Sequence, residues 1–542
     1  MNAMDTEETP QDGSAAAPTP GPSDRRAVLS SDVRIPRHRR TSRGQSGSRG
    51  SRRAFPGAPG PFRSPALRGA VVGTLVGCAV LGGVLMVQGR GEDPEPPALG
   101  PAGRAMAAVG AGTPAALADL GALIGEREAH LRAYPGDDDS WAVLGSAYVE
   151  RGLRTADSGD YPKAERALRT SLKARPEGNV QALTGLAALG NARHDFRAAK
   201  KWGEQAVRLA PRRWTAHAAL LDTYRGLGDT KGVARALEKV RKLRSGAAVR
   251  VRTGTVFRDR GWREDAAAAL ADAAALAKTP AERAVCLYEV GQLSWERGEA
   301  ADALRHYDAA LAADPDHHPA LAGKGRALAA LGRTSEALRA YQGALARQPA
   351  PEYALELGEL YEFLKLRPAA RAQYDLLRTR VKQAGLGGVN DERVLGRYEA
   401  DHGDPEAAVR RLTAEFKRHG SPENADALGW ALHRNGDSKA GLKKVETAVK
   451  KGPRSAVFFY HRGEIERALE RYGDARRHLS EALRINPHFS PLGVPAARKA
   501  LEALGEPPEG GPSQVYAPPG EVPAPLPSPK PSGKPKPRAS AD

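Results

Sequence analysis

One short pattern of residues recurs about ten times between Asp138 and Pro487, nearly always at intervals of 33 or 34 residues. One copy consists of Leu287, Val290, Gly291, Gly298, Ala303, Tyr307, Ala310 and Pro315. The next copy consists of Leu321, Gly325, Leu328, Gly332, Ala337, Tyr341, Ala344 and Pro349. A fixed period of this size is typical of a solenoid, in which each unit buries its apolar face only by stacking on its neighbours. The repetition therefore predicts one array of stacked units without a second core.

Each unit has the pattern of two helices joined by a turn. Residues between Leu287 and Ser294 recur at i, i+3, i+4 and i+7, which places them on one helix face. Gly298 ends this helix, a second stripe runs from Ala303 to Ala310, and Pro315 closes the unit. Small residues such as Gly291 are expected where the two helix backbones approach each other.

This order of residues resembles the tetratricopeptide repeat, whose pattern is aromatic or Leu, Leu-Gly, Tyr, Gly, Ala, aromatic, Ala and Pro. Trp141, Leu144, Gly145 and Tyr148 open the first copy in the most typical form. The match covers about 350 of 542 residues, with repeat starts near residues 138, 180, 214, 247, 284, 318, 351, 389, 422 and 456. The resemblance implies an all-α solenoid of about ten helix-turn-helix units that coil into a right-handed superhelix. The first helix of each unit would line a concave groove in which partners bind.

An uncharged apolar run from Gly69 to Gly89 is long enough to span a bilayer as one helix. The twenty residues before the run hold five Arg and no acidic residue, whereas the twenty after it hold two Arg and three acidic residues. Positive charge gathers on the cytoplasmic side, so we expect a single-pass membrane protein with a cytoplasmic N-terminus and an extracytoplasmic repeat region. Gly69, Gly73 and Gly77 share one helix face, a spacing that lets two membrane helices pair as a homodimer.

Three other interpretations of the apolar run stay open. A cleaved secretory signal needs a small-residue cleavage site soon after the run, and residues 88–91 offer none. Residues 75–78 resemble the lipobox of bacterial lipoproteins, but the apolar run continues well beyond Cys78. A buried helix of a soluble domain would need an apolar partner segment, and none adjoins the run. A spanning anchor is therefore the prediction.

The segments that flank the repeats contain too few apolar residues for a core of their own. Residues 1–68 carry 12 Arg against 6 acidic residues, and 12 of the last 37 residues are Pro. Such compositions predict disorder, whereas helical periodicity on either side of the repeats predicts a cap at each end. The predicted organisation is 1–68 disordered Arg-rich segment, 69–89 transmembrane helix, 90–113 flexible linker, 114–137 N-terminal capping helix, 138–489 solenoid, 490–505 C-terminal capping helix and 506–542 Pro-rich disordered tail.

The sequence carries no signature of a catalytic, cofactor or metal site. HExxH, GxSxG, phosphate-loop and convincing GxGxxG motifs are all missing from it. The pair His317 and His318 lies in a turn, where exposed loop polarity is a simpler interpretation than a metal site. Cys78 and Cys286 supply neither a disulfide framework nor zinc-ligand spacing. Since no residues remain outside the repeats for a catalytic domain, we expect a non-enzymatic protein without a cofactor.

Candidate partner-binding residues follow from the repeat register. In the family, positions 2, 5, 9, 12 and 13 from each repeat start face the groove. Aromatic residues outside the packing positions are natural anchors for a partner, with packing against the neighbouring repeat as the alternative. The candidates are Tyr288, Gln292, Trp295, Glu359, Phe363, Trp430, His433, Arg434, Tyr460 and Glu464.

Together these patterns predict a non-catalytic interaction scaffold that is anchored in a bacterial cytoplasmic membrane and binds proteins or peptides in its groove. The bacterial assignment rests on abundant Ala, Gly and Pro and on an excess of Arg over Lys, which are typical of high-GC genomes. The alternative is a cytoplasmic or nucleoid-associated adaptor whose basic N-terminus contacts nucleic acid. Ten Arg and no acidic residue lie between Arg34 and Arg68, but attraction to anionic lipid headgroups explains the same segment.

Overall fold

The structure is a computed structural model that describes residues 98–505. This part of the chain contains 23 α-helices, α2 to α24, and no strand. Across the same residues no helix combines the length and the apolar character that crossing a bilayer requires. The predicted disordered ends and the predicted transmembrane helix at residues 69–89 lie outside the described residues.

Ten consecutive helix pairs form the array, and we call the first helix of each pair A and the second B. Eight of the ten predicted repeat starts coincide with the first residue of an A helix, whereas α12 and α18 begin at Pro280 and Glu392 instead of near 284 and 389. The A helices are α4 (Asp138–Thr155), α6 (Val180–Ala192), α8 (Trp214–Leu227), α10 (Ala247–Asp259), α12 (Pro280–Glu296), α14 (His318–Ala330), α16 (Pro351–Phe363), α18 (Glu392–His402), α20 (Pro422–Arg434) and α22 (Ala456–Ala468). The B helices are α5 (Asp160–Ala174), α7 (Phe196–Leu209), α9 (Thr230–Leu243), α11 (Arg263–Leu276), α13 (Ala300–Ala313), α15 (Thr334–Arg347), α17 (Arg367–Leu386), α19 (Pro405–Arg418), α21 (Ser438–Lys451) and α23 (Tyr472–Ile485).

Glycine allows the two helices of a pair to touch. A Cβ atom added to Gly291 would lie 2.7 Å from Cε1 of Tyr307, which is closer than real Cβ atoms approach other atoms. Gly358 stands in the same relation to Tyr374, at 2.4 Å. The large ring on the B helix fills the space that the missing side chain leaves, and Tyr307 is completely buried. The residues that define the repeat in the sequence are thus packing residues.

Single helices lie before and after the ten pairs. α3 (Leu117–Ala133) lies within the segment predicted to cap the first repeat, and α24 (Gly493–Leu504) lies within the segment predicted to cap the last. The prediction of a flexible linker over 90–113 is wrong for residues 101–111, which form α2 (Pro101–Ala111). This segment has Pro in its first turn and five alanines, both of which favour a helix, and Arg104 bonds it to Asp119 of α3.

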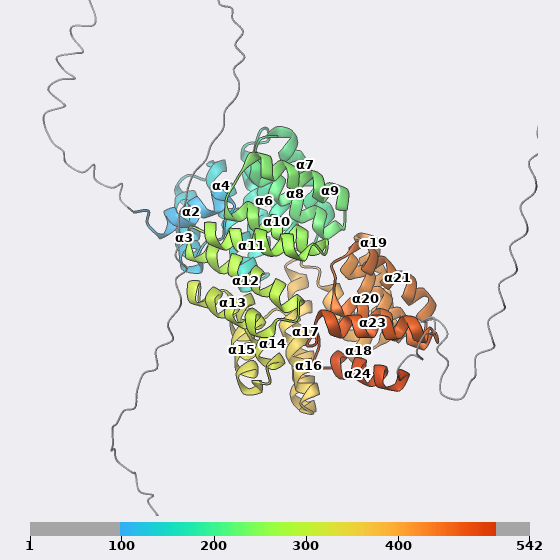
Figure 1. The fold of residues 1–542 in the computed structure, drawn as a ribbon. Helices are drawn as coiled ribbons and strands as arrows, with labels where there is room; N and C mark the ends of the chain where they lie inside the picture. The colour runs from blue at the N-terminus through green and yellow to red at the C-terminus, as the bar shows by residue number, and fades with distance from the viewer. Residues whose placement is uncertain (1–97, 506–542) are drawn as a thin grey trace, which may run out of the picture. The chain divides into compact units, whose positions relative to one another are not determined.

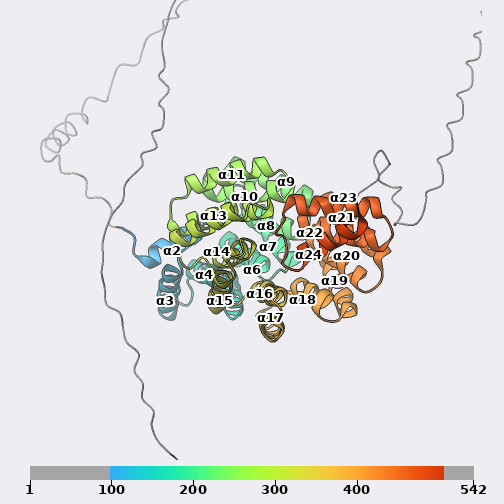
Figure 2. The ribbon, with the colours of Figure 1, turned by 60° about the horizontal axis from the view of Figure 1, so that its bottom comes forward.

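The later repeats return to touch the earlier ones. The turn between the A and B helices of repeats 1 to 5 meets the end of a repeat four to six units further along. Asn486 Nδ2 donates to the carbonyl of Trp295 at 2.7 Å, and Arg263 Nη2 donates to the carbonyl of Arg454 at 2.7 Å. Figures 1 and 2 both show the C-terminal pairs, in orange and red, beside the green pairs α8 to α11. We call this contact the seam, formed by residues 153–159, 193–197, 228, 261–263 and 295–299 on one side and 314, 348, 383–391, 417–421, 454 and 485–487 on the other.

Candidate partner-binding groove

The A helices of repeats 1 to 5 line one open cavity with a volume of about 510 Å³. Ser146, Ala188, Asp222 and Thr255 contribute to its wall. Each of these four residues is the ninth of its repeat, one of the positions predicted to face the groove. The cavity is therefore the concave face of the first five repeats, which we call the groove.

The turn between α2 and α3 occupies one side of the groove. Gly112, in a left-handed conformation with φ of 62°, ends α2. A Cβ atom on Gly112 would lie 3.1 Å from Cγ2 of Thr215 and 3.4 Å from the ring of Trp214. Since Trp214 begins repeat 3, this segment reaches across the groove from the N-terminal cap. We call residues 109–115 the groove segment.

Two side chains of α4 meet the main chain of the groove segment at Ala115. Arg154 Nη1 donates to the carbonyl of Ala115, and the carboxylate of Glu150 lies close enough for the Ala115 N–H to affect its pKa. Burial raises the pKa of Glu150 above its ordinary value, although the nearby Arg154 and Arg252 and the Ala115 N–H oppose this shift. Arg154 thus binds a main-chain carbonyl beside a carboxylate, an arrangement that suits extended backbone whatever its side chain.

Ion pairs between neighbouring A helices cover much of the remaining concave face. Arg225 Nε lies 2.7 Å from Asp259 Oδ2, and Arg258 Nη1 lies 2.5 Å from Glu289 Oε2. Burial lowers the pKa of Arg258, but the carboxylates of Glu289, Glu296 and Asp259 outweigh it and raise this pKa above its ordinary value. A partner in the groove would therefore meet Arg225 and Glu289, which line it, as members of existing ion pairs.

None of the ten predicted groove residues lines this cavity. Three of them belong to repeat 5 and pack towards repeat 6. The ring of Tyr288 lies 5.1 Å from that of His317, and Gln292 Oε1 accepts from Nη1 of Arg326 at 3.3 Å. Trp295 is only 9% exposed and belongs to the apolar cluster of repeats 5 to 8.

The two candidates on α16 differ in exposure. Phe363 is 46% exposed and contributes to no apolar cluster among the described residues. Glu359 is half-buried and lies 3.9 Å from Nε2 of His402 on α18. Phe363 is therefore the aromatic candidate best placed to touch a partner in the second half of the array.

The candidates of repeats 9 and 10 form one aromatic and charged group. Trp430 is 8% exposed, donates from Nε1 to Asp401 at 2.9 Å and stacks on His461 at 4.3 Å. His433 and Tyr460 lie beside the same indole, at 5.1 and 5.8 Å between ring centroids. Arg434 is exposed and pairs with Asp401, and Glu464 pairs with Arg467 at 2.9 Å. Trp295 and Trp430 thus have packing positions, whereas partner binding by any of the ten residues stays a prediction.

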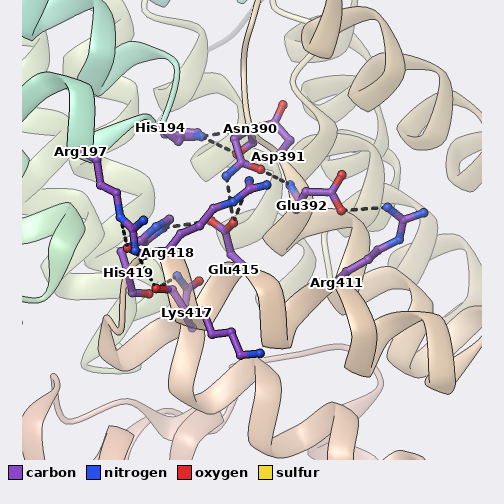
Figure 3. A network of polar contacts seen from close by, with 11 residues as sticks. His194, Arg197, Asn390, Asp391, Glu392, Arg411, Glu415, Lys417, Arg418 and His419 are labelled. Carbon is purple, nitrogen blue, oxygen red and sulfur yellow. Dashed lines mark hydrogen bonds and ion pairs between the residues drawn. The ribbon is translucent and has the colours of Figure 1, made fainter.

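Polar side chains connect the two sides of the seam, as Figure 3 shows. Nδ1 of His194 lies 3.1 Å from the carbonyl oxygen of Asn390 and 3.4 Å from Oδ1 of Asp391. Asn390 Nδ2 in turn donates to Glu415 at 2.9 Å, and Arg197 donates to the carbonyl of Lys417 at 2.9 Å. Burial would raise the pKa of Glu415, but hydrogen bonds from His419 and Asn390 outweigh it and lower this pKa. The seam is therefore held by polar contacts, and at Arg263 and Arg454 it also borders an open cavity of about 580 Å³.

Within residues 98–505 no three His, Cys, Asp or Glu side chains are arranged to hold a metal ion. His317 instead caps α14, since its Nδ1 accepts from the N–H of Ala320 at 3.2 Å. Cys286 is buried on α12, and burial raises the pKa of its thiol to about 12. Within the described residues, His317 is thus a helix cap and Cys286 a buried packing residue.

Sequence reasoning missed the site at Glu150 and Arg154. Glu150 is the thirteenth residue of repeat 1, so the same register applied to the first four repeats would have selected it. Arg154 lies four residues further along α4, beyond the positions that the family pattern assigns to the groove. The predicted candidates lie in repeats 5, 7, 9 and 10, outside this cavity, and of their aromatic residues Trp295 and Trp430 pack in apolar clusters whereas Phe363 is exposed.

Models of the tetratricopeptide repeat match residues 149–213, 294–360 and 427–488, so the chain contains tetratricopeptide repeats in an all-helical solenoid. No curated protein sequence matches it significantly. Solved structures with a similar arrangement include the human IFIT1 dimer with m7Gppp-AAAA, at 16% identity and a TM-score of 0.40, covering 64% of this chain and 80% of that one.

Two further solved structures resemble smaller or looser parts of the array. TTC0263, a thermophilic TPR protein of Thermus thermophilus, has 22% identity and a TM-score of 0.29, covering 36% of this chain and 99% of that one. Yeast Tom70 has 13% identity and a TM-score of 0.30, covering 67% of this chain and 96% of that one. Scores this low carry no information on what this chain binds.

Proposed function

We propose that this chain is a non-catalytic scaffold that binds an extended segment of a partner protein in the groove of repeats 1 to 5. Tetratricopeptide repeats favour this role because a stacked array presents a long concave surface. The observation that carries the proposal is the groove segment, whose main chain at Ala115 is bonded by Arg154 and lies beside Glu150. A partner would extend along the rest of the cavity, against Gln181 and Asp222.

Site-specific photo-cross-linking in the full chain tests the groove. We expect a cross-linking residue at Gln181, on the groove wall, to give adducts with a partner in cells that express the protein. Arg169 of α5, whose side chain is 60% exposed outside the groove, is the matched control and should give none. Adducts from Phe363 or Tyr460 with none from Gln181 would contradict the proposal and place binding in the second half of the array.

We further propose that residues 69–89 anchor the scaffold in the cytoplasmic membrane and that the repeats face the outside of the cytoplasm. The apolar run and the Arg asymmetry around it support this arrangement. Alkaline phosphatase fused after Asp542 should be active, because this reporter matures only outside the cytoplasm. An inactive phosphatase together with a fluorescent cytoplasmic reporter at the same junction would refute the orientation.

The glycine face of the anchor supports a homodimer. Gly69, Gly73 and Gly77 would let two membrane helices approach closely. Replacing Gly73 by Leu should then abolish disulfide-independent cross-linking between two full-length copies in the membrane. Unchanged cross-linking would show that the copies associate elsewhere or not at all.

A further inference from the structure

Positive charge is concentrated in one block of the array. Residues 193–263 hold 19 Lys and Arg against 6 Asp and Glu, a formal net charge of +13. Residues 98–192 hold 10 against 11, and residues 264–505 hold 36 against 34. A bias of the genome towards Arg would spread charge over all ten repeats, so a local cause is needed for this block.

The cations of this block include a set on the outward side of α7, α9 and the turns that follow them. Lys231, Arg235 and Lys239 are spaced by four residues and therefore line one side of α9. Lys201 of α7 is the equivalent of Arg235, 34 residues earlier. We call the set the basic face, and it comprises Lys201, Arg208, Arg212, Lys231, Arg235, Lys239, Arg241 and Arg244, all exposed.

None of these eight side chains forms an ion pair with a described residue, although ion pairs are frequent elsewhere in the array. Within the block, Lys242 pairs with Glu238 on the same side of α9 as Lys231, and Lys200 pairs with Glu204 on α7. Like charges four residues apart on a helix destabilise it slightly. A surface that gathers unpaired like charges at a cost in stability is suited to an anionic partner.

We propose that the basic face docks on the anionic headgroups of a lipid bilayer. Its cations lie on α7, α9 and the turns after them and line neither the groove nor the cavity beside Arg454, and a membrane surface needs no groove to bind. Proteins that bind single-stranded nucleic acid combine a basic groove with exposed aromatic platforms, whereas Trp202 and Trp214 are partly buried against repeat cores and the exposed Trp262 follows α10, outside the basic face. The inference depends on the proposed membrane anchor in one respect: the anchor would hold the basic face at a high local concentration of lipid.

Lysine acylation of the full chain in vesicles tests the basic face. We expect Lys201, Lys231 and Lys239 to react at least about threefold more slowly in phosphatidylcholine vesicles that contain phosphatidylglycerol than in phosphatidylcholine alone. The protection should disappear near 0.5 M salt, where charges are screened within about 4 Å. Lys365 and Lys382, exposed on other repeats, are the internal controls and should react equally in both vesicles.

Charge reversal provides the matched variants. Lys201→Glu with Arg235→Glu should remove the protection of Lys239, whereas Lys365→Glu with Lys382→Glu should preserve it. Equal reactivity of the basic face in both vesicles would overturn the proposal, as would protection by duplex DNA but not by phosphatidylglycerol. Anchoring by residues 69–89 is measured separately, because an anchored chain stays bound to neutral vesicles even when its basic face does not contact lipid.

Discussion

Individual residues set the distance between the helices of each pair. At Gly291 the nearest atom of Tyr307 would be 2.7 Å from an added Cβ, and Tyr307 is itself completely buried. Tyr307 cannot move away from Gly291 without disturbing the next repeat, since its ring also lies 2.7 Å from the position of a Cβ atom added to Gly323. One ring thus fixes two helices at once.

Replacing Gly291 by Leu should therefore destabilise the array by about 1–3 kcal/mol, because the added side chain overpacks this contact. Gly420→Ala is the control, since its nearest atom would be 3.6 Å away, an ordinary contact. Urea unfolding of the two variants beside the parent measures both effects. Equal midpoints for all three proteins would contradict the assigned packing.

His317 links stability to pH. It caps α14 through an unprotonated Nδ1, and burial together with Arg154 lowers its pKa to about 4. An unfolded histidine titrates near pH 6.5, so the unfolded chain takes up a proton first. The stability from this residue is complete above about pH 6.5 and decreases as the pH falls towards 4, by at most about 3 kcal/mol.

His317→Asn should keep the cap and lose this pH dependence. The difference in the free energy of unfolding between pH 7 and pH 4.5 should be smaller for the variant than for the parent. Identical pH profiles would show that protonation of His317 is not coupled to folding.

At the scale of helices, the sequence period predicted the array because the residues that recur are those on which helix pairing depends. Gly291, Ala303 and Tyr307 make their contacts within one repeat or with the next, so the same chemistry returns every 34 residues. The repeat register predicts which side of the A helices forms the concave face, but not which side chains on that face are free to contact a partner. Trp295 lies beneath Arg326 of the next repeat, 5.6 Å from its guanidinium, and no repeat position specifies that partner.

Because Trp295 and Trp430 are buried, replacing either of them should lower the stability of the array. Trp295→Ala and Trp430→Ala should each lower stability by about 3–5 kcal/mol, as expected for large buried side chains. Phe363→Ala, at 46% exposure, should change it little. Circular dichroism melts of the three variants separate these cases, and a melt of Trp430→Ala equal to that of the parent would place its indole outside the core.

Arg154 connects three elements, since it bonds Ala115 of the groove segment and forms an ion pair with Asp314 after α13. Arg154→Ala should release the groove segment and speed amide exchange in residues 109–115 at least about tenfold, a loss of about 1.4 kcal/mol in local protection. Arg132→Ala on α3, an exposed site, is the control. Unchanged exchange in the Arg154 variant would mean that apolar contacts alone hold the segment.

At the scale of the whole array, the seam sets this chain apart from a solenoid whose units contact only their neighbours. The seam positions recur with the repeat, because A–B turns on one side meet repeat ends on the other, but the residues at these positions differ from one repeat to the next. For this reason no pattern in the sequence indicated Asn486 as the partner of Trp295. The seam should couple the two halves in unfolding.

Asn486→Ala tests this coupling. Asn486 is 2% exposed, and loss of its amide should cost about 1–3 kcal/mol and speed amide exchange both around residue 486 and in the turn after α12. Asn191→Ala, which breaks a comparable bond to Ala219 of the adjacent repeat, should speed exchange only in repeats 2 and 3. Faster exchange near residue 486 alone would show that the two halves unfold independently.

The seam also limits how a gene for such a chain can evolve. Repeat arrays gain and lose units by duplication and deletion, which an open array tolerates because each unit contacts only its neighbours. Deleting unit 6 here would shift pairings across the seam by one repeat, and the turn of Trp295 would face unrelated side chains. Descendants that keep the bond between Asn486 and Trp295 should therefore keep the number of units between these two residues while their surfaces diverge.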